Sequence, residues 1–197
     1  MQISLHATEE KIIQAYLRVC YRQGFEKITL EKLAKESKVS LASVRYHFSD
    51  PSNTLEDATL MYVLVRGYSY IQKFMEPEKK RPGYRALYTY INANFAWAQA
   101  HLEESRFILY YFYLLGTPNR NRIAKLPYLQ KARERIEEMF YIDVGRGLLK
   151  PIDNVKDFIV DLHNMLAGSM IISFIENTKG AHDKHRKRVL ATLPYGA

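Results

Sequence analysis

The chain has 197 residues, of which 47% are hydrophobic and 25% are charged, and its formal net charge is +8 at pH 7. This composition is that of a globular protein and excludes the disordered and fibrous classes. The disulfide-rich class is also excluded, because the single cysteine, Cys20, has no partner for an internal disulfide. The positive charge favours a polyanionic partner, either nucleic acid or an anionic membrane surface. No uninterrupted apolar stretch reaches about 18 residues and the N-terminus lacks a leader pattern, so we expect a cytoplasmic protein that does not span a membrane.

Strand signals are nearly absent, since no segment alternates cleanly with period two and no Asn-Gly or Asp-Gly pair lies between apolar runs. Proline and glycine instead divide the chain into segments with helical spacing. We therefore expect an all-α fold.

The first helix is predicted from Thr8 to about Gln23, with Thr8 as its N-cap and two glutamates in its first turn, where the helix dipole favours acids. Its apolar residues recur at helical spacing on one broad face. Gly24 is expected to end the helix as a left-handed cap residue, with Phe25 folded back over the last turn.

Two short helices follow. Thr29 is predicted to cap the second helix, which presents Leu30, Leu33 and Ala34 inward. Val39 lies in a tight turn, and Ser40 caps a third helix that ends near Phe48 and carries a single arginine, few charges and two aromatic residues around a histidine. Three short helices joined by tight turns predict a helix-turn-helix unit whose third helix is available for a DNA groove.

The remainder is predicted as a larger helical bundle. Asp50 and Pro51 read as the N-cap and first position of a helix that runs to about Phe74. Pro77 and Pro82 bracket a polar linker, after which helices are expected near 83–101, 104–115, 119–145 and 153–179. The basic residues that follow read as a solvated tail: Lys184, Arg186, Lys187 and Arg188.

The N-terminal residues resemble the tetracycline-repressor (TetR) family of transcriptional regulators. The residues that carry this resemblance lie between positions 8 and 55, in matching order and spacing: Thr8, Ile12, Ala15, Val19, Cys20, Gly24, Thr29, Leu33, Ala34, Val39, Ser40, Ser43, Tyr46, His47, Phe48 and Leu55. From residue 56 to 197 only the helical pattern is similar. The resemblance implies a helix-turn-helix DNA-binding domain over residues 1–50 and a ligand-binding and dimerisation domain over residues 51–197.

The resemblance also implies a function. A homodimer, formed through the last two long helices, would place two third helices in successive major grooves of a palindromic operator and would act as a repressor that responds to a small molecule. Residues matching Thr29, Ser43, Tyr46 and His47 would contact phosphates, and positions matching Leu41, Ala42 and Arg45 would contact bases, with Ser40 at the helix start. The chemistry agrees, because hydroxyl groups and helix-start amides bind phosphate, whereas arginine grips guanine bidentately.

One departure from the family pattern concerns the start of the fourth helix. Family members usually have a lysine there that contacts a phosphate, whereas this chain has Asp50 and Pro51. The backbone amides of Ser52 and Asn53 could compensate. Whether the loss of the lysine weakens DNA binding is left open by the sequence.

Aromatic residues crowd residues 84–113, and many of them are tyrosines whose hydroxyl groups need partners. Aromatic residues at helical spacing usually form core, but ten within about 30 residues favour a cavity for a flat or apolar effector. We predict Trp97, Tyr110, Tyr113 and His163 as its wall.

Other chemistries have little support in the sequence. His182 and His185 have a spacing that could bind a metal on a helix, but three residues in a charged tail seldom do, so we expect no metal or cofactor. We find no nucleophile triad, phosphate loop or metalloprotease motif. The alternative to a regulator is a helical-bundle enzyme that uses an aromatic cavity, with the N-terminal unit as an ancillary DNA tether. Membrane attachment through the basic tail is supported by only four positive charges.

Overall fold

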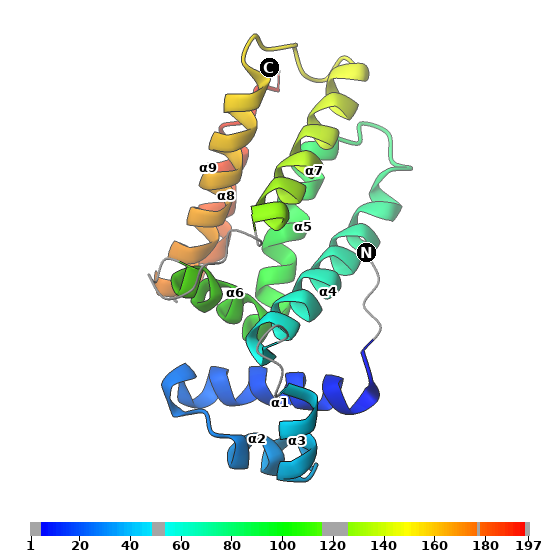
Figure 1. The fold of residues 1–197 in the computed structure, drawn as a ribbon. Helices are drawn as coiled ribbons and strands as arrows, with labels where there is room; N and C mark the ends of the chain where they lie inside the picture. The colour runs from blue at the N-terminus through cyan, green and yellow to red at the C-terminus, as the bar shows by residue number, and fades with distance from the viewer. Residues whose placement is uncertain (1–4, 49–53, 116–125, 177, 196–197) are drawn as a thin grey trace. The chain divides into compact units, whose positions relative to one another are not determined.

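The computed structural model describes residues 5–48, 54–115, 126–176 and 178–195, with side chains except at 112–115 and 126–128. The helices over these residues are α1 (Ala7–Gln23), η1 (Phe25–Lys27, a 3-10 turn), α2 (Leu30–Ser37), α3 (Leu41–Phe48), α4 (Leu55–Glu78), α5 (Ala86–Ala100), α6 (Leu102–Leu115), α7 (Leu126–Gly145), α8 (Val155–Glu176) and α9 (Ala181–Leu190), as drawn in Figure 1. Within these ranges the sole β feature is an isolated bridge between Leu149 and Tyr195. The predicted all-α fold is confirmed.

Backbone contacts divide the chain into two compact units. We call Met1–Tyr68 with His101–Pro118 the helix-turn-helix unit, and Ser69–Ala100 with Asn119–Ala197 the bundle unit. By this packing, α6 belongs with the N-terminal helices, and α4 contributes residues to both units. The predicted domain boundary at residue 50 separates a DNA-binding domain from a ligand-binding domain by their function, and it stays a prediction.

Helix α1 is the centre of the helix-turn-helix unit. Its buried residues lie on one broad face, as the periodicity predicts: Ile12, Ile13, Ala15, Tyr16, Leu17, Val19 and Cys20. The predicted cap at Thr8 is wrong by two residues, because the helix begins at Ala7 with His6 as its N-cap. The His6 ring accepts from the Thr8 amide, and Glu9 Oε2 accepts from the His6 amide at 2.8 Å, so the two side chains satisfy free amides reciprocally. Gly24 follows the end of the helix as predicted, and its φ of 83° favours glycine, but its ψ of 160° differs from that of the expected left-handed cap.

Helix α2 confirms the predicted cap, since Thr29 Oγ1 accepts from the Lys32 amide at 3.3 Å. Leu33 is buried as expected, but Leu30 is 40% exposed and does not point into the core. With Leu30 at the first position of a helix of eight residues, only the side that faces α1 is covered.

Helix α6 packs on α1 through aromatic contacts. Phe107 is fully buried and meets Tyr16 edge to face, with ring centroids 5.9 Å apart. Phe25, expected to fold over the end of α1, stacks on Tyr110 of α6 with centroids 3.5 Å apart. The start of α6 is also tied to α4, because Arg66 Nε lies 2.9 Å from Glu104 Oε1.

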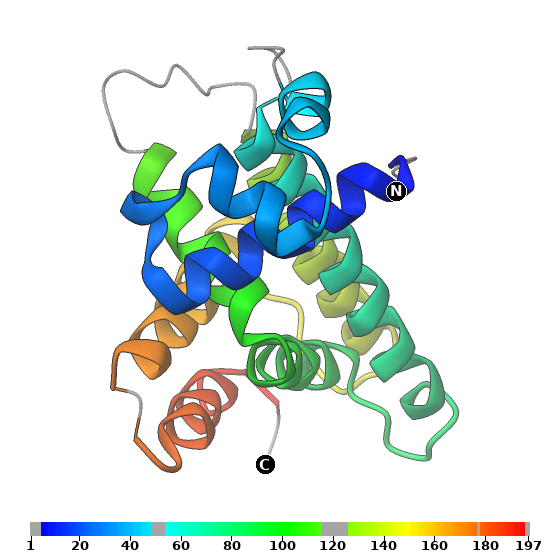
Figure 2. The same cartoon turned by 90° about the horizontal axis from the view of Figure 1, so that it is seen from below.

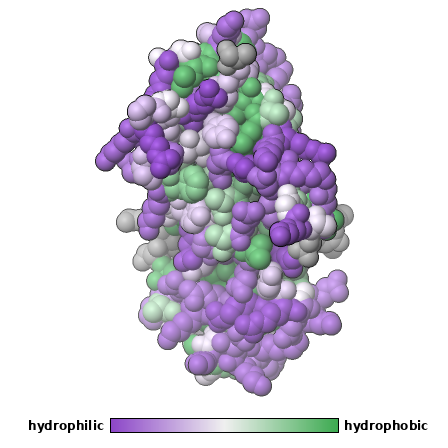
Figure 3. Space-filling model, turned by 180° about the vertical axis from the view of Figure 1, so that it is seen from behind, coloured by the Kyte–Doolittle hydropathy of each residue, from purple (hydrophilic) through white to green (hydrophobic). Residues whose placement is uncertain are grey.

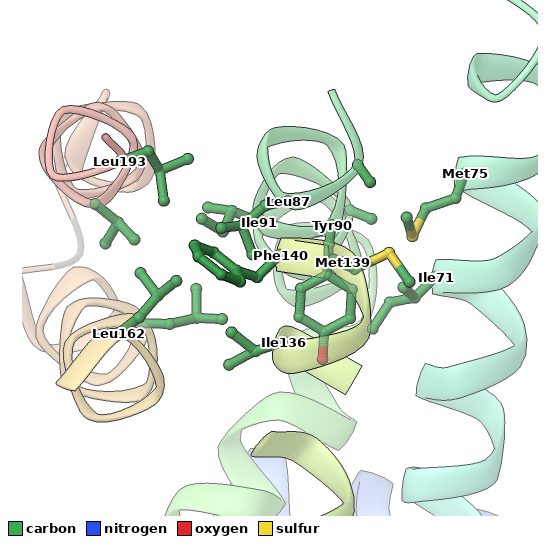
Figure 4. Packing of buried hydrophobic residues seen from close by; sticks show 14 of the residues in the cluster. Ile71, Met75, Leu87, Tyr90, Ile91, Ile136, Met139, Phe140, Leu162 and Leu193 are labelled. Carbon is green, nitrogen blue, oxygen red and sulfur yellow. The ribbon is translucent and has the colours of Figure 1, made fainter. Parts of the chain in front are cut away.

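The core of the bundle unit forms around α5, which contacts α7, α8 and α9. The buried residues come from every helix of the unit, and Figure 4 shows their side chains converging between α4, α5, α7 and α8. Those labelled there are Ile71, Met75, Leu87, Tyr90, Ile91, Ile136, Met139, Phe140, Leu162 and Leu193. Tyr84, Tyr90, Phe95 and Trp97, which belong to the aromatic run, are buried in this unit.

A buried carboxylate holds the start of α5 in place. Asp143 of α7 is fully buried, and its two oxygens accept from the Ala86 amide at 2.7 Å and the Leu87 amide at 2.9 Å. The Tyr195 hydroxyl donates to the same carboxylate at 2.6 Å. Asp143 therefore satisfies the free amides of a helix N-terminus and anchors the C-terminal segment.

Two expectations need correction. The basic residues read as a solvated tail lie on α9, a helix that buries His185 and Val189 and packs on α8 and α5. Pro77 lies inside the last turn of α4 rather than in a linker. α4 begins at Leu55, where Thr54 Oγ1 accepts from the Asp57 amide; the predicted cap at residues 50–51 lies outside the described residues.

Helix α8 is the one helix in the described ranges that is long and apolar enough to cross a membrane by length and composition, with a window of mean hydropathy 1.6. No such helix was expected from the sequence. Ile159, Leu162 and Leu166 of α8 are buried in the bundle core, and 28% of the apolar window is buried in all. Three further apolar residues of α8 are exposed: Met165 at 39%, Ile172 at 47% and Ile175 at 75%.

Replacing Asp143 tests the anchor at the start of α5. Asp143→Ala leaves two amides and a hydroxyl without their acceptor, so the free energy of unfolding should fall by about 3 kcal/mol or more. Tyr195→Phe removes one bond and should cost about 1 kcal/mol. Asp161→Ala, on an exposed position of α8, is the control and should stay within about 0.5 kcal/mol. Chemical denaturation measures all three, and equal midpoints for Asp143→Ala and Asp161→Ala would contradict the anchor.

Candidate nucleic-acid interface

The turn between α2 and α3 has a defined backbone geometry. Lys38 adopts a left-handed conformation with φ 57°, and the Val39 amide donates to the Ala34 carbonyl oxygen at 3.1 Å. Ser40 then caps α3, because its Oγ accepts from the Ser43 amide at 3.0 Å. The predicted cap at Ser40 is confirmed. Together these bonds fix where α3 starts relative to α2.

The two sides of α3 differ sharply. Val44 is fully buried, whereas Ala42, Arg45 and Tyr46 are exposed, and Tyr46 is 81% exposed. Positions i, i+3 and i+4 share one face of a helix, so these three side chains form a single outward surface. Figure 2 looks onto α2 and α3, and on the side drawn in Figure 3 the residues of α1 to α3 form a mostly hydrophilic surface.

Arg45 has an acidic neighbour on α2. The pKa of the Glu31 carboxyl is lowered by hydrogen bonding to its own backbone amide and to the Thr29 hydroxyl, and the positive charge of Arg45 adds to this effect. Glu31 therefore stays ionised beside the guanidinium. An acid in this place opposes phosphate by charge.

His47 points toward α1. Its Nδ1 lies 3.3 Å from Glu9 Oε1, its side chain is 13% exposed, and its ring lies 5.7 Å from the His6 ring between centroids. When Nδ1 donates to Glu9, the remaining nitrogen Nε2 of a neutral imidazole is an acceptor. The predicted phosphate contact through His47 therefore needs the doubly protonated ring.

The eight predicted DNA-contacting residues fall on the α2 cap, the turn and α3. Thr29, Ser40, Ala42, Arg45 and Tyr46 are exposed; the half-buried ones are Leu41, Ser43 and His47. Sequence reasoning missed Glu9 and Glu31, which hold His47 and lie beside Arg45. For Glu9 a signal was present, since it follows His6 by the three-residue spacing of a reciprocal cap.

The four residues predicted for an effector cavity are placed in different units. Trp97 and His163 belong to the bundle unit, and Tyr110 and Tyr113 belong to the helix-turn-helix unit. The Tyr113 side chain lies outside the described residues. Burial, with Arg133 nearby, lowers the pKa of His163, whose Nδ1 is buried without a hydrogen-bond partner among the described residues. The prediction that these four residues line one effector cavity stays a prediction.

Two further contacts bear on other chemistries. Ser173 Oγ lies 2.9 Å from His182 Nδ1, which resembles a nucleophile and its base. Ser173 is 1% exposed and its hydroxyl also donates to the Met170 carbonyl oxygen, so we interpret this pair as a packing contact between α8 and α9. Over the part of the chain with described placement, no cluster of three or more His, Cys, Asp or Glu could hold a metal ion.

No family model matches the sequence, and no curated protein matches it. Solved structures, in contrast, do match this chain. A TetR transcription regulator from Haloarcula marismortui has a TM-score of 0.76 at 18% identity, over 93% of this chain and 95% of that one. The fatty acid degradation regulator FadR from Bacillus halodurans has a TM-score of 0.71 at 15% identity, over 98% and 100%. AibR, solved in complex with isovaleryl coenzyme A and operator DNA, has a TM-score of 0.63 at 13% identity, over 96% and 100%.

These likenesses extend through nearly the whole chain, including the part where the sequence matched only in its helical pattern. The resemblance noted in residues 8–55 thus holds for the complete architecture, and the chain has the fold of TetR-family transcriptional regulators.

Proposed function

We propose that this chain is a DNA-binding transcriptional regulator, a repressor that binds a palindromic operator as a homodimer in the cytoplasm. The observation that carries the proposal is the outward surface of α3, where Ala42, Arg45 and Tyr46 are exposed on a helix anchored by the buried Val44. A short helix with one exposed arginine and few other charges fits a major groove, where base edges must come close.

The contacts divide into two classes in this proposal. Arg45 donates bidentately to guanine, and Ala42 and Leu41 lie near a thymine methyl group, which provides base selectivity. Thr29, Ser43 and Tyr46 donate to phosphates and set the position of the helix on the duplex. Since net charge is +8 over the whole chain, non-specific attraction adds to both.

Small-molecule control is the second part of the proposal. Among proteins of this fold, one was solved with isovaleryl coenzyme A and operator DNA and another is described as a gamma-butyrolactone receptor. Within the helix-turn-helix unit, Arg66 of α4 pairs with Glu104 of α6, and the Tyr62 hydroxyl of α4 donates to Glu10 of α1 at 3.2 Å. A shift of α4 on effector binding would therefore move α1, and with it α2 and α3.

Dimer formation through the last two long helices, α7 and α8, is supported by apolar exposure. Ile172 and Ile175 of α8 are 47% and 75% exposed, and Tyr141 of α7 is 53% exposed. Apolar side chains of this size are usually covered when several lie on neighbouring helices. Ala167, Gly168 and Ser169 leave room for a second helix to approach closely.

Arg45→Ala tests the base contact. On the cognate site it should weaken binding by about 1 to 3 kcal/mol and reduce the difference between cognate and altered sites. Tyr46→Phe should weaken binding to all sequences alike, because it removes a phosphate donor. Fluorescence anisotropy with both kinds of duplex at fixed salt measures these effects.

Arg188→Ala is the matched control, since it removes the same charge from an exposed position of α9 in the other unit. It should leave base preference unchanged. If Arg45→Ala keeps the wild-type preference, or if Arg188→Ala changes it equally, Arg45 does not read the bases.

A double change, Ile172→Glu with Ile175→Glu, tests the dimer surface. Two carboxylates in an apolar interface are costly to desolvate, so the protein should sediment as a monomer of 23.1 kDa while remaining folded by circular dichroism. Leu102→Glu, at a residue of α6 that is 38% exposed, is the control and should leave the dimer intact. A dimer that survives the double change would place the interface elsewhere.

A further inference from the structure

Two adjoining hollows lie along α5 in the bundle unit. The first, of about 500 Å³, lies between the last turns of α4, the loop that follows and the start of α5. The second, of about 320 Å³, lies between α4, α5 and α9. Phe74 and Asn92 line both, so we treat them as one feature, the α5 groove. Figure 2 shows α5 running between the end of α4 and α9. The volumes fall in the range of small-molecule sites.

The floor of the α5 groove is one face of a single helix. Tyr88, Asn92, Ala96 and Gln99 line it at a spacing that repeats on one side of α5. The twelve residues from first to last span about 16 Å at 1.5 Å rise per residue. Phe74 and Tyr88 are 36% and 40% exposed, so aromatic surface is available along this length. The shape favours an elongated ligand with an apolar body.

Charges along the groove are balanced except at one end. Glu78 pairs with Arg81 at 2.8 Å, and Asp183 pairs with both Arg186 and Lys187. Arg85 also lines the groove, and its guanidinium lies 4.8 Å from the centroid of the Tyr195 ring. Among the described residues it forms no ion pair with a carboxylate. One uncompensated positive charge therefore lies beside the start of α5.

We propose that the α5 groove binds an elongated organic carboxylate, with the carboxylate at Arg85 and the apolar body along Phe74, Tyr88 and Ala96. A carboxylate matches the charge at this end of the groove, because it neutralises a guanidinium and accepts from its N–H groups. Binding of the carboxylate in the groove does not depend on DNA recognition. The further claim that this carboxylate is the effector rests on the proposed function.

Dodecanoate below its micelle concentration is the probe, and dodecyltrimethylammonium has the same chain with the opposite charge. Trp97 is the single tryptophan of the chain and follows Ala96 on α5, so its fluorescence reports binding, with titration calorimetry as a second readout. Dodecanoate should bind saturably, and the ammonium compound should bind at least tenfold more weakly.

Four variants locate the site. Arg85→Ala should weaken dodecanoate binding at least tenfold, whereas Arg85→Lys should restore part of the loss. Arg188→Ala removes an equal charge outside the groove and should have no effect. Ala96→Phe fills the floor and should abolish binding of the apolar body. Circular dichroism establishes that each variant is folded.

The proposal is overturned if dodecanoate does not bind, if the ammonium compound binds equally well, or if folded Arg85→Ala and Ala96→Phe proteins bind as the wild type does. These titrations contain no DNA. A negative result therefore leaves operator binding untouched, and failure of operator binding leaves the groove result unchanged.

Discussion

The burial of one face of α1 is the constraint on which the DNA-binding surface depends. Ile12 and Ile13 are fully buried, and Leu33 of α2 and Val44 of α3 complete the same small core. A core this small is sensitive to the loss of any one side chain. With Val44 held inside, helical geometry directs Arg45 and Tyr46 outward. The polar side of α3 is thus a consequence of apolar packing on its other side.

Two acidic residues, Glu9 and Glu31, lie next to this surface and affect side chains that belong to it. Glu9 satisfies the His6 amide and also holds His47, so one carboxylate links the start of α1 to the end of α3. Glu31 lies beside Arg45 and stays ionised. Both carboxylates oppose phosphate by charge, yet Glu9 limits the freedom of His47, which is expected to meet DNA. Such preorganisation lowers the entropy that binding must overcome.

Local features were predictable, and features that depend on distant partners were not. The caps at Thr29 and Ser40 follow from hydroxyl groups next to free amides, and both are present. Leu30 was expected inside, but its exposure depends on which side of α2 meets α1. α9 was missed because its sequence is dominated by charge, although His185 and Val189 are enough to pack it. The Asp143 anchor joins residues more than 50 positions apart, which no sequence pattern reveals.

The candidate DNA residues followed from the resemblance together with their chemistry, whereas the α5 groove required coordinates, since α4, α5 and α9 bring its residues together. Methylation protection on genomic fragments selected by the purified protein tests the central claim most directly. The account predicts protected guanine N7 atoms in two half-sites about 10 base pairs apart, as two α3 helices in successive major grooves require. Specific binding that leaves every major-groove N7 open to methylation would contradict it.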